Sequence, residues 1–264
     1  MTCVTPASAW SEDLALAREI ADTADNITMV RFGAVDLKVE TKPDLTPVSD
    51  ADTAVETALR RRLAADREDD AVIGEEYGVT GESAREWIVD PIDGTKNCVR
   101  GAPVWATLLA LRVEGEVVLG VVSAPALGRR WWAARGGGAW TSYHGRERHI
   151  TTSHVASLDD AFLSYSSLSG WGERQDSLLA LTSRVWRTRA FGDFWSHMLV
   201  AEGAVDISCE PEVSLWDLAA LQPIVEEAGG RFSDLSGVGR PDGGSVVCTN
   251  GLLHDEVLAS LSPG

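Results

Sequence analysis

The sequence predicts an α/β protein with a helical start, a central β-rich region and a second α/β unit. Apolar residues between Leu14 and Val30 recur at three- and four-residue spacing, which is typical of a helix with one buried face. Short runs rich in β-branched and aromatic residues follow between residues 71 and 134, and strands and helices alternate again toward the C-terminus. The 264 residues, 44% hydrophobic and 24% charged, suffice for one large domain or two modest ones.

The segment after the first helix contains a turn-rich connection and a second helix. Gly33 ends the first helix, and residues 36–48 combine an alternating first half with two prolines, which favours a hairpin or an extended loop. Ser49 is a good N-cap for a second helix that we expect to run to about Ala65. Asp50 and Asp52 lie in its first turn, where carboxylates favour the helix dipole.

The remaining elements are predicted from apolar runs and their Gly, Pro or charged boundaries. The predicted strands of the first sheet cover residues 71–76, 86–90, 105–113, 116–124 and 129–134. A Gly-rich and polar stretch at 136–149 is the predicted division between an N-terminal half, 1–145, and a C-terminal half, 146–264, within one compact unit. The second half is predicted to contain strands at 161–167 and 244–249 and helices at 173–183, 195–203, 217–228 and from 252.

Charge and cysteine content exclude several classes of protein. Lys and Arg total 23 against 40 Asp and Glu, and the net charge of −17 disfavours nucleic-acid binding. The four cysteines are far apart and form no Cys-x-x-Cys pair, which indicates a reducing compartment rather than a disulfide scaffold or a zinc site. No basic, apolar leader and no membrane-length apolar run is present, so we expect a cytoplasmic protein without a membrane partner.

The segment Trp87-Ile-Val-Asp-Pro-Ile-Asp-Gly-Thr95 carries the clearest chemical signal. Asp90 and Asp93 follow an apolar run, and Pro91 restricts the turn between them, so both carboxylates can point toward one site. Gly94 allows an anion to approach the main chain, and a helix beginning at Gly94 or Thr95 would direct N–H groups at a phosphate. Alone, however, such a motif is more often a solvated turn.

Two further acidic elements could join this site. Glu75 and Glu76 end an earlier β-run, and Asp217 starts a later helix, although separately these are an ordinary surface pair and a helix cap. Carboxylates without His or Cys are the ligands of Mg²⁺ rather than zinc. Four carboxylates contribute −4 and two or three divalent ions +4 or +6, so the pocket of an acidic protein can still attract a phosphate.

Together these segments resemble the signatures of the inositol monophosphatase family. The resemblance rests on Gly74-Glu-Glu76, on Trp87 to Thr95 and on Trp216-Asp-Leu-Ala-Ala220, and it extends to the loop from Lys42 to Asp50 and to Glu227-Ala-Gly-Gly230. The segments 95–106, 130–132 and Gly192-Asp-Phe194 resemble the histidinol-phosphate phosphatase branch of that family. Lys96 and Cys98 depart from the commonest family pattern without touching the acidic residues.

The resemblance implies a layered αβαβα sandwich, two or three Mg²⁺ ions, a homodimer and hydrolysis of a phosphate ester by an activated water. It implies metal ligation by Glu75, Asp90, Asp93, Asp217 and the Ile92 carbonyl, with Asp90 shared between two metals. It further implies that Glu75 and Thr95 orient the water, that Asp44 supports Thr95, and that the backbone of Gly94 and Thr95 binds phosphate.

The branch also implies a substrate, a small phosphorylated amino alcohol. Because histidinol phosphate carries an ammonium and an imidazole, its pocket needs anionic acceptors away from the metals. Asp193 and Glu210 lie where this family contacts the rest of the substrate, and both are acidic here; Asp217 completes the predicted substrate contacts. Asp193 is also a candidate helix cap, and Glu210 a candidate surface acid.

Three alternatives remain open from the sequence. One is a phosphatase for inositol monophosphate or for a sugar or nucleotide phosphate. Another is a non-catalytic module that binds Mg²⁺ or Ca²⁺, although the regular spacing of a Ca²⁺ loop is missing. The third is an interaction protein, but this alternative does not explain why three acidic segments occur at the ends of predicted strands or helices.

Overall fold

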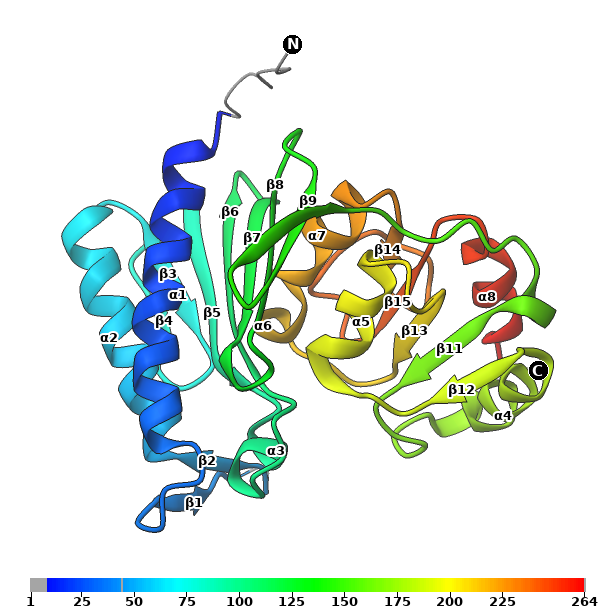
Figure 1. Cartoon of the computed structure of the whole chain (residues 1–264), viewed down its shortest axis with the longest axis horizontal. Helices are drawn as coiled ribbons and strands as arrows, with labels where there is room; N and C mark the ends of the chain where they lie inside the picture. The colour runs from blue at the N-terminus through cyan, green and yellow to red at the C-terminus, as the bar shows by residue number, and fades with distance from the viewer. Residues whose placement is uncertain (1–8, 44, 264) are drawn as a thin grey trace.

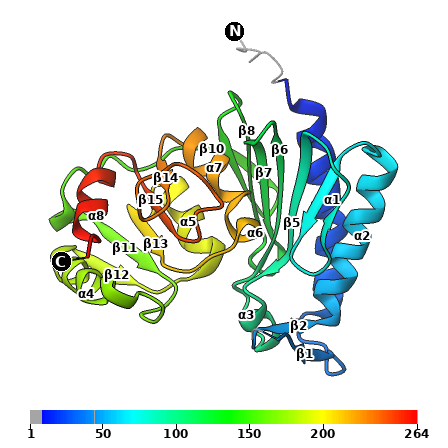
Figure 2. The same cartoon turned by 180° about the vertical axis from the view of Figure 1, so that it is seen from behind.

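The computed structural model describes residues 9–43 and 45–263, which form five layers (Figures 1 and 2). Two long helices cover one face of an eight-stranded sheet, and three shorter helices separate that sheet from a five-stranded one. Two further helices cover the outer face of the second sheet. The predicted αβαβα sandwich is therefore confirmed.

The outer helical layer and its connection agree with the sequence pattern. The helices are α1 (Ser11–Arg31) and α2 (Asp50–Asp66), and the segment between them forms the antiparallel pair β1 (Val39–Thr41) and β2 (Pro47–Ser49). Of the two possibilities for residues 36–48, the hairpin is observed. The buried face of α1 packs on the first sheet, as the apolar spacing predicts.

The first sheet is mixed, with the order β10-β9-β8-β7-β6-β5-β3-β4. Its strands are β3 (Ala71–Gly74), β4 (Gly78–Thr80), β5 (Arg85–Asp93), β6 (Ala106–Val113), β7 (Glu116–Ala124), β8 (Arg129–Ala134), β9 (Ala139–Tyr143) and β10 (Arg146–Ile150). Only β3 and β5 pair in parallel. The first sheet continues to Ile150, because the polar residues of β10 pair with β9 as an exposed edge strand. The predicted division at residue 145 therefore lies within the β9–β10 hairpin.

The second sheet has the order β12-β11-β13-β15-β14 and lies against the middle helices. Its strands are β11 (Phe162–Tyr165), β12 (Arg187–Arg189), β13 (Ile207–Glu210), β14 (Arg231–Ser233) and β15 (Val246–Thr249). The helices are α3 (Thr95–Val99) beside the hairpin, α5 (Asp193–Ala201), α6 (Leu215–Leu218) and α7 (Leu221–Glu227) in the middle layer, and α4 (Gln175–Arg184) and α8 (His254–Ser260) outside. The described residues also contain three short 3₁₀ turns, Pro125–Leu127, Leu158–Asp160 and Gly172–Arg174.

The single helix predicted over residues 217–228 is wrong in detail, because this segment contains two helices. The break at Ala219 and Ala220 precedes Pro223. Proline has no N–H to donate to the carbonyl four residues earlier, and its ring crowds that carbonyl, here Ala219. The change of direction carries Asp217 to the pocket and lets α7 pack between the two sheets.

Two features bear on the compartment predictions. Among the described residues, Cys98, Cys209 and Cys248 are free and buried. Within residues 9–43 and 45–263, no helix combines the length and the apolar character needed to cross a bilayer.

His254 gives the fold a defined pH dependence. The imidazole is buried between Ser233 and Thr249, and burial, with the charge of Arg231, lowers its pKa to about 4. In the unfolded chain the same group titrates near 6.5. Because the folded state binds this proton more weakly, the free energy of unfolding should fall between pH 6.5 and 4, by up to about 3 kcal/mol.

Urea unfolding of the wild type and of His254→Gln at pH 7 and pH 4.5 measures this contribution. The variant should show a smaller loss of stability on acidification than the wild type. An identical loss in both proteins would mean that His254 does not titrate as described.

Candidate active site

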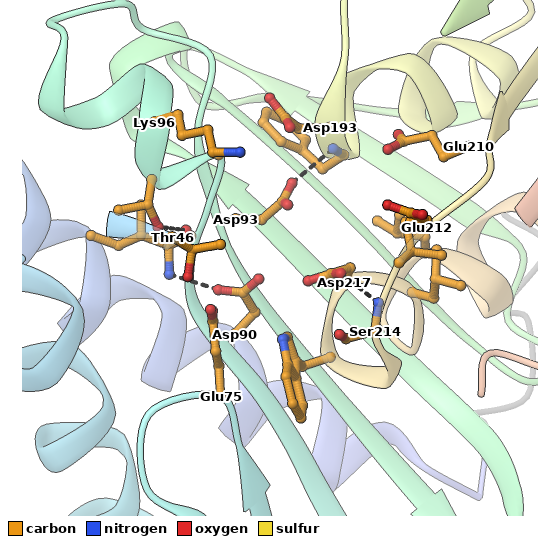
Figure 3. Close-up of a pocket in the computed structure, with 18 of the residues that line it drawn as sticks. Thr46, Glu75, Asp90, Asp93, Lys96, Asp193, Glu210, Glu212, Ser214 and Asp217 are labelled. Carbon is orange, nitrogen blue, oxygen red and sulfur yellow. Dashed lines mark hydrogen bonds between the residues drawn. The ribbon is translucent and has the colours of Figure 1, made fainter. Parts of the chain in front are cut away.

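A pocket of about 320 Å³ opens where β5, α3, α5, β13 and α6 meet (Figure 3). Every predicted site residue that the structure describes lines it: Glu75, Asp90, Ile92, Asp93, Gly94, Thr95, Asp193, Glu210 and Asp217. Asp44 lies outside the described residues. The fold therefore brings together side chains that are up to 142 positions apart, from Glu75 to Asp217.

Three carboxylates form the centre of the pocket. Asp90 and Asp93 lie at the end of β5, where a register shift between them turns both toward the pocket. Asp217 lies at the third position of α6, where the Ser214 N–H donates to its Oδ2 at 2.7 Å. One oxygen from each of the three lies within 4.8 Å of the other two.

This cluster carries more negative charge than its surroundings neutralise. Burial, followed by the charges of Glu75 and Asp93, raises the pKa of Asp90 well above its ordinary value. Burial likewise raises the pKa of Asp93, and it raises the pKa of Asp217 to about 7. Like charges held this close favour either protonation or a bound cation.

The donor set fits a hard divalent cation. The three groups offer only carboxylate oxygens, the ligands of Mg²⁺ and Ca²⁺, whereas a zinc site would draw on His or Cys. Asp90 is only 1% exposed, so without a cation its ionised form would be a costly buried charge.

Glu75 lies beside the cluster and contacts a lysine of the hairpin. The Lys42 Nζ atom lies 2.7 Å from Glu75 Oε1 and 2.7 Å from Glu76 Oε1. Gly74, the last residue of β3, lets Glu56 approach the backbone, because a Cβ there would lie 2.0 Å from Glu56 Oε1. The Glu56 carboxylate in turn accepts from the Glu76 N–H at 2.8 Å and so fixes the direction of the acidic pair.

Gly94 and Thr95 join β5 to α3. Gly94 has φ +82°, and a Cβ would lie 2.8 Å from the Val104 carbonyl oxygen, so both its conformation and its packing require glycine. The Thr95 hydroxyl lies 2.9 Å from the Ile92 carbonyl oxygen and 3.1 Å from Asp52 Oδ1. A buried carboxylate is therefore within reach of the threonine hydroxyl.

Asp52 is a contact of Thr95 that the sequence patterns do not predict, whereas the predicted support of Thr95 by Asp44 lies outside the described residues. The other Asp52 oxygen accepts from the Ser49 N–H at 2.8 Å, which completes a capping box at the start of α2. The available signal is the Ser49-x-x-Asp52 spacing, which indicates only the start of a helix. The Asp52 side chain thus both caps α2 and contacts Thr95, which lines the pocket.

Asp193 and Glu210 form the wall away from Glu75 (Figure 3). Asp193 has φ +49° and accepts from Asn97 Nδ2 at 2.7 Å. The turn at Asp193 also directs the Phe194 N–H to Asp93 Oδ2 at 2.8 Å, which links this wall to the carboxylate cluster. Burial, with the charge of Glu210, raises the pKa of Asp193 to about 6.

The comparison with protein families agrees with this geometry. The sequence model of the inositol monophosphatase family matches residues 9–263, nearly the whole chain. The chain belongs to the inositol monophosphatase family. Within this family, solved structures with the same architecture include the Thermotoga maritima IMPase, with a TM-score of 0.86 and 31% identity over 95% of this chain and 96% of that one. The extragenic suppressor protein suhB of Bartonella henselae has a TM-score of 0.88 and 28% identity over 96% and 100% of the two chains.

Two relatives with higher sequence identity are named for one specific activity. The histidinol-phosphatase of Mycobacterium tuberculosis is 60% identical over 257 residues, 96% of this chain and 99% of the relative. The histidinol-phosphatase of Streptomyces coelicolor is 56% identical over 260 residues, 96% and 98% of the two chains. The inositol-1-monophosphatase of Rhizobium meliloti is 34% identical over 228 residues.

Proposed function

We propose that this protein is a Mg²⁺-dependent phosphatase that hydrolyses L-histidinol phosphate to L-histidinol and phosphate. The observation that carries the proposal is one pocket containing both a three-carboxylate cluster and a separate acidic wall. The relatives named histidinol-phosphatase, at 60% and 56% identity over nearly the whole chain, support the choice of substrate.

The carboxylate cluster would hold the magnesium. Asp90, Asp93 and Asp217 provide the oxygens that lie together, and Glu75 and the Ile92 carbonyl line the same pocket as further ligands. When bound, Mg²⁺ would lower the pKa of the attacking water and neutralise charge on the phosphate. The N–H groups of Gly94 and Thr95, at the start of α3, would contact the phosphate oxygens.

Thr95 and Asp52 provide a path for the proton of the attacking water. The Thr95 hydroxyl can accept a hydrogen bond from that water while it donates its own proton to Asp52 Oδ1. Burial raises the pKa of Asp52, which makes its carboxylate a better proton acceptor. Thr95 would therefore orient the water, and Asp52 would receive the proton.

The acidic wall would recognise the organic part of the substrate. Histidinol phosphate carries an ammonium group and an imidazole that can be protonated, whereas inositol phosphate offers neutral hydroxyls. Asp193 and Glu210 line the pocket together and present carboxylate oxygens. Pairing a substrate cation with a partly buried carboxylate gives specificity, because a neutral ester leaves that carboxylate without a partner.

Replacement of Asp193 tests this recognition. Asn keeps the side-chain shape and tolerates the positive φ of this position, but it removes the charge. Asp193→Asn should raise KM for histidinol phosphate about tenfold or more and change KM for inositol 1-phosphate by less than about threefold. Steady-state phosphate release on both substrates measures the difference, and equal effects would argue against a role in recognising the cation.

The function itself is tested by phosphate release from L-histidinol phosphate and from inositol 1-phosphate, each with and without Mg²⁺. The proposal expects Mg²⁺-dependent release with a clear preference for histidinol phosphate. A preference for inositol phosphate would favour the other phosphatase class. Metal-dependent melting without phosphate release from either ester would favour the non-catalytic module.

The proposal includes a homodimer in the cytoplasm, as the resemblance and the composition indicate. Sedimentation equilibrium of the purified protein tests the dimer, and fractionation of the producing cells tests the location. A monomer that is fully active would separate the assembly from the catalytic function.

A further inference from the structure

Helix α5 and strand β13 together provide the two carboxylates of the acidic wall and two further polar side chains beside them. Asp193 and His197 are four residues apart on α5 and therefore lie on one helical face. Ser208 and Glu210 are two residues apart on β13 and therefore lie on one side of the sheet. The two faces meet, because α5 packs against β13.

His197 joins these faces. Its Nε2 atom lies 3.1 Å from Glu210 Oε1, and its Nδ1 atom lies 2.7 Å from Ser208 Oγ. The imidazole is 1% exposed, and it lines the pocket beside the carboxylate that it contacts. The second Glu210 oxygen accepts from Ser166 Oγ at 2.8 Å. His197 and Ser166 therefore fix the positions of the two Glu210 oxygens.

Glu210 needs this support because its surroundings are strongly acidic. It is 8% exposed, and the pocket also contains Asp193 and the three carboxylates of the cluster. The neighbouring carboxylates repel Glu210, and a repelled carboxylate tends to turn away from them. Turned away, it could not pair with the cation of a substrate. The contact of His197 with Glu210 Oε1 opposes this rotation.

We propose that His197 is a positioning residue that holds the Glu210 carboxylate directed into the pocket, and that it thereby sets the preference for cationic phosphate esters. This inference rests on the proposed function. The histidine does not touch the cluster of Asp90, Asp93 and Asp217 in the contacts above, so its effect should appear in substrate selection rather than in the chemical step.

The experiment compares two buried histidines in the Mg²⁺-loaded enzyme. His197→Phe removes the donor to Glu210, and His197→Gln keeps a neutral N–H in its place. His254→Gln is the matched control, because His254 is equally buried and bonded to two hydroxyls but lies away from the pocket. Initial rates are measured with L-histidinol phosphate and with a neutral ester, inositol 1-phosphate or glycerol 2-phosphate. Calorimetry measures the Kd of L-histidinol and of inorganic phosphate.

His197→Phe should raise KM for histidinol phosphate and the Kd of L-histidinol by about tenfold or more, with kcat and the neutral ester changed by less than about threefold. His197→Gln should restore part of the loss. His254→Gln should leave the ratio of kcat/KM for the two esters unchanged, even where it lowers stability.

Equal losses on both esters, or a loss in kcat alone, would overturn the inference and indicate a structural role. If His197→Phe does not fold, His197→Gln decides: a partial rise in KM that is confined to histidinol phosphate supports the inference, and an unselective loss overturns it. A wild type that releases no phosphate from histidinol phosphate would instead contradict the proposed function, so the two failures are distinguishable.

Discussion

Asp90→Asn is expected to abolish phosphate release, with kcat reduced by at least about 10³-fold, while the protein stays folded. Asp90 is the most buried carboxylate of the cluster, and one of its oxygens lies within 4.8 Å of oxygens of Asp93 and Asp217. The amide preserves volume and can still contact the Ile92 N–H, which lies 2.9 Å from Asp90 Oδ1. It removes the charge that would hold the cation. Asp217→Asn should behave in the same way.

Thermal melting with and without Mg²⁺ gives a second measurement that is independent of turnover. The wild type should melt at a higher temperature with Mg²⁺, because a ligand that binds only the folded state stabilises it. Asp90→Asn should lose most of this shift. Without metal, the variant should melt at or above the wild type, since one buried like charge is gone. Near-normal turnover in both Asp90→Asn and Asp217→Asn would remove the metal cluster from the mechanism.

Thr95→Val is expected to lower kcat by about 10²- to 10³-fold with little change in KM. Valine keeps the shape of threonine but removes the hydroxyl that lies between Ile92 and Asp52. Without this hydroxyl the water would lose both its orientation and its path to Asp52. Asp52→Asn should also lower kcat, since the amide does not accept the proton.

A matched substitution separates this chemistry from packing. Thr28 is 1% exposed and donates to the Ala24 carbonyl oxygen within α1, outside the residues that line the pocket. Thr28→Val changes the same atoms and should leave kcat within about twofold of the wild type. If Thr95→Val kept wild-type turnover, the hydroxyl would have no part in orienting the water.

Local patterns in the chain were sufficient for most elements. The apolar spacing of α1 predicted its buried face, because that periodicity is a property of the helix itself. Ser49 predicted the start of α2, and the Asp90-Pro-Ile-Asp93 spacing predicted a turn with two carboxylates at the end of a strand. Two features depend on neighbouring segments: β10 pairs with β9, and the helix predicted over residues 217–228 is divided at the residues that precede Pro223.

The acidic site also has features that the sequence predicts and features that depend on the packing of distant segments. The residue types and their order along the chain indicate a site for metal and phosphate. Mg²⁺ prefers oxygen ligands, and glycine allows an anion to approach the backbone, so both features can be recognised within a short segment. Three contacts depend on how the layers pack: Thr95 with Asp52, His197 with Glu210, and Phe194 with Asp93. These contacts join residues brought together by the stacking of helices on sheets, and no periodicity within one segment encodes a distance to another segment.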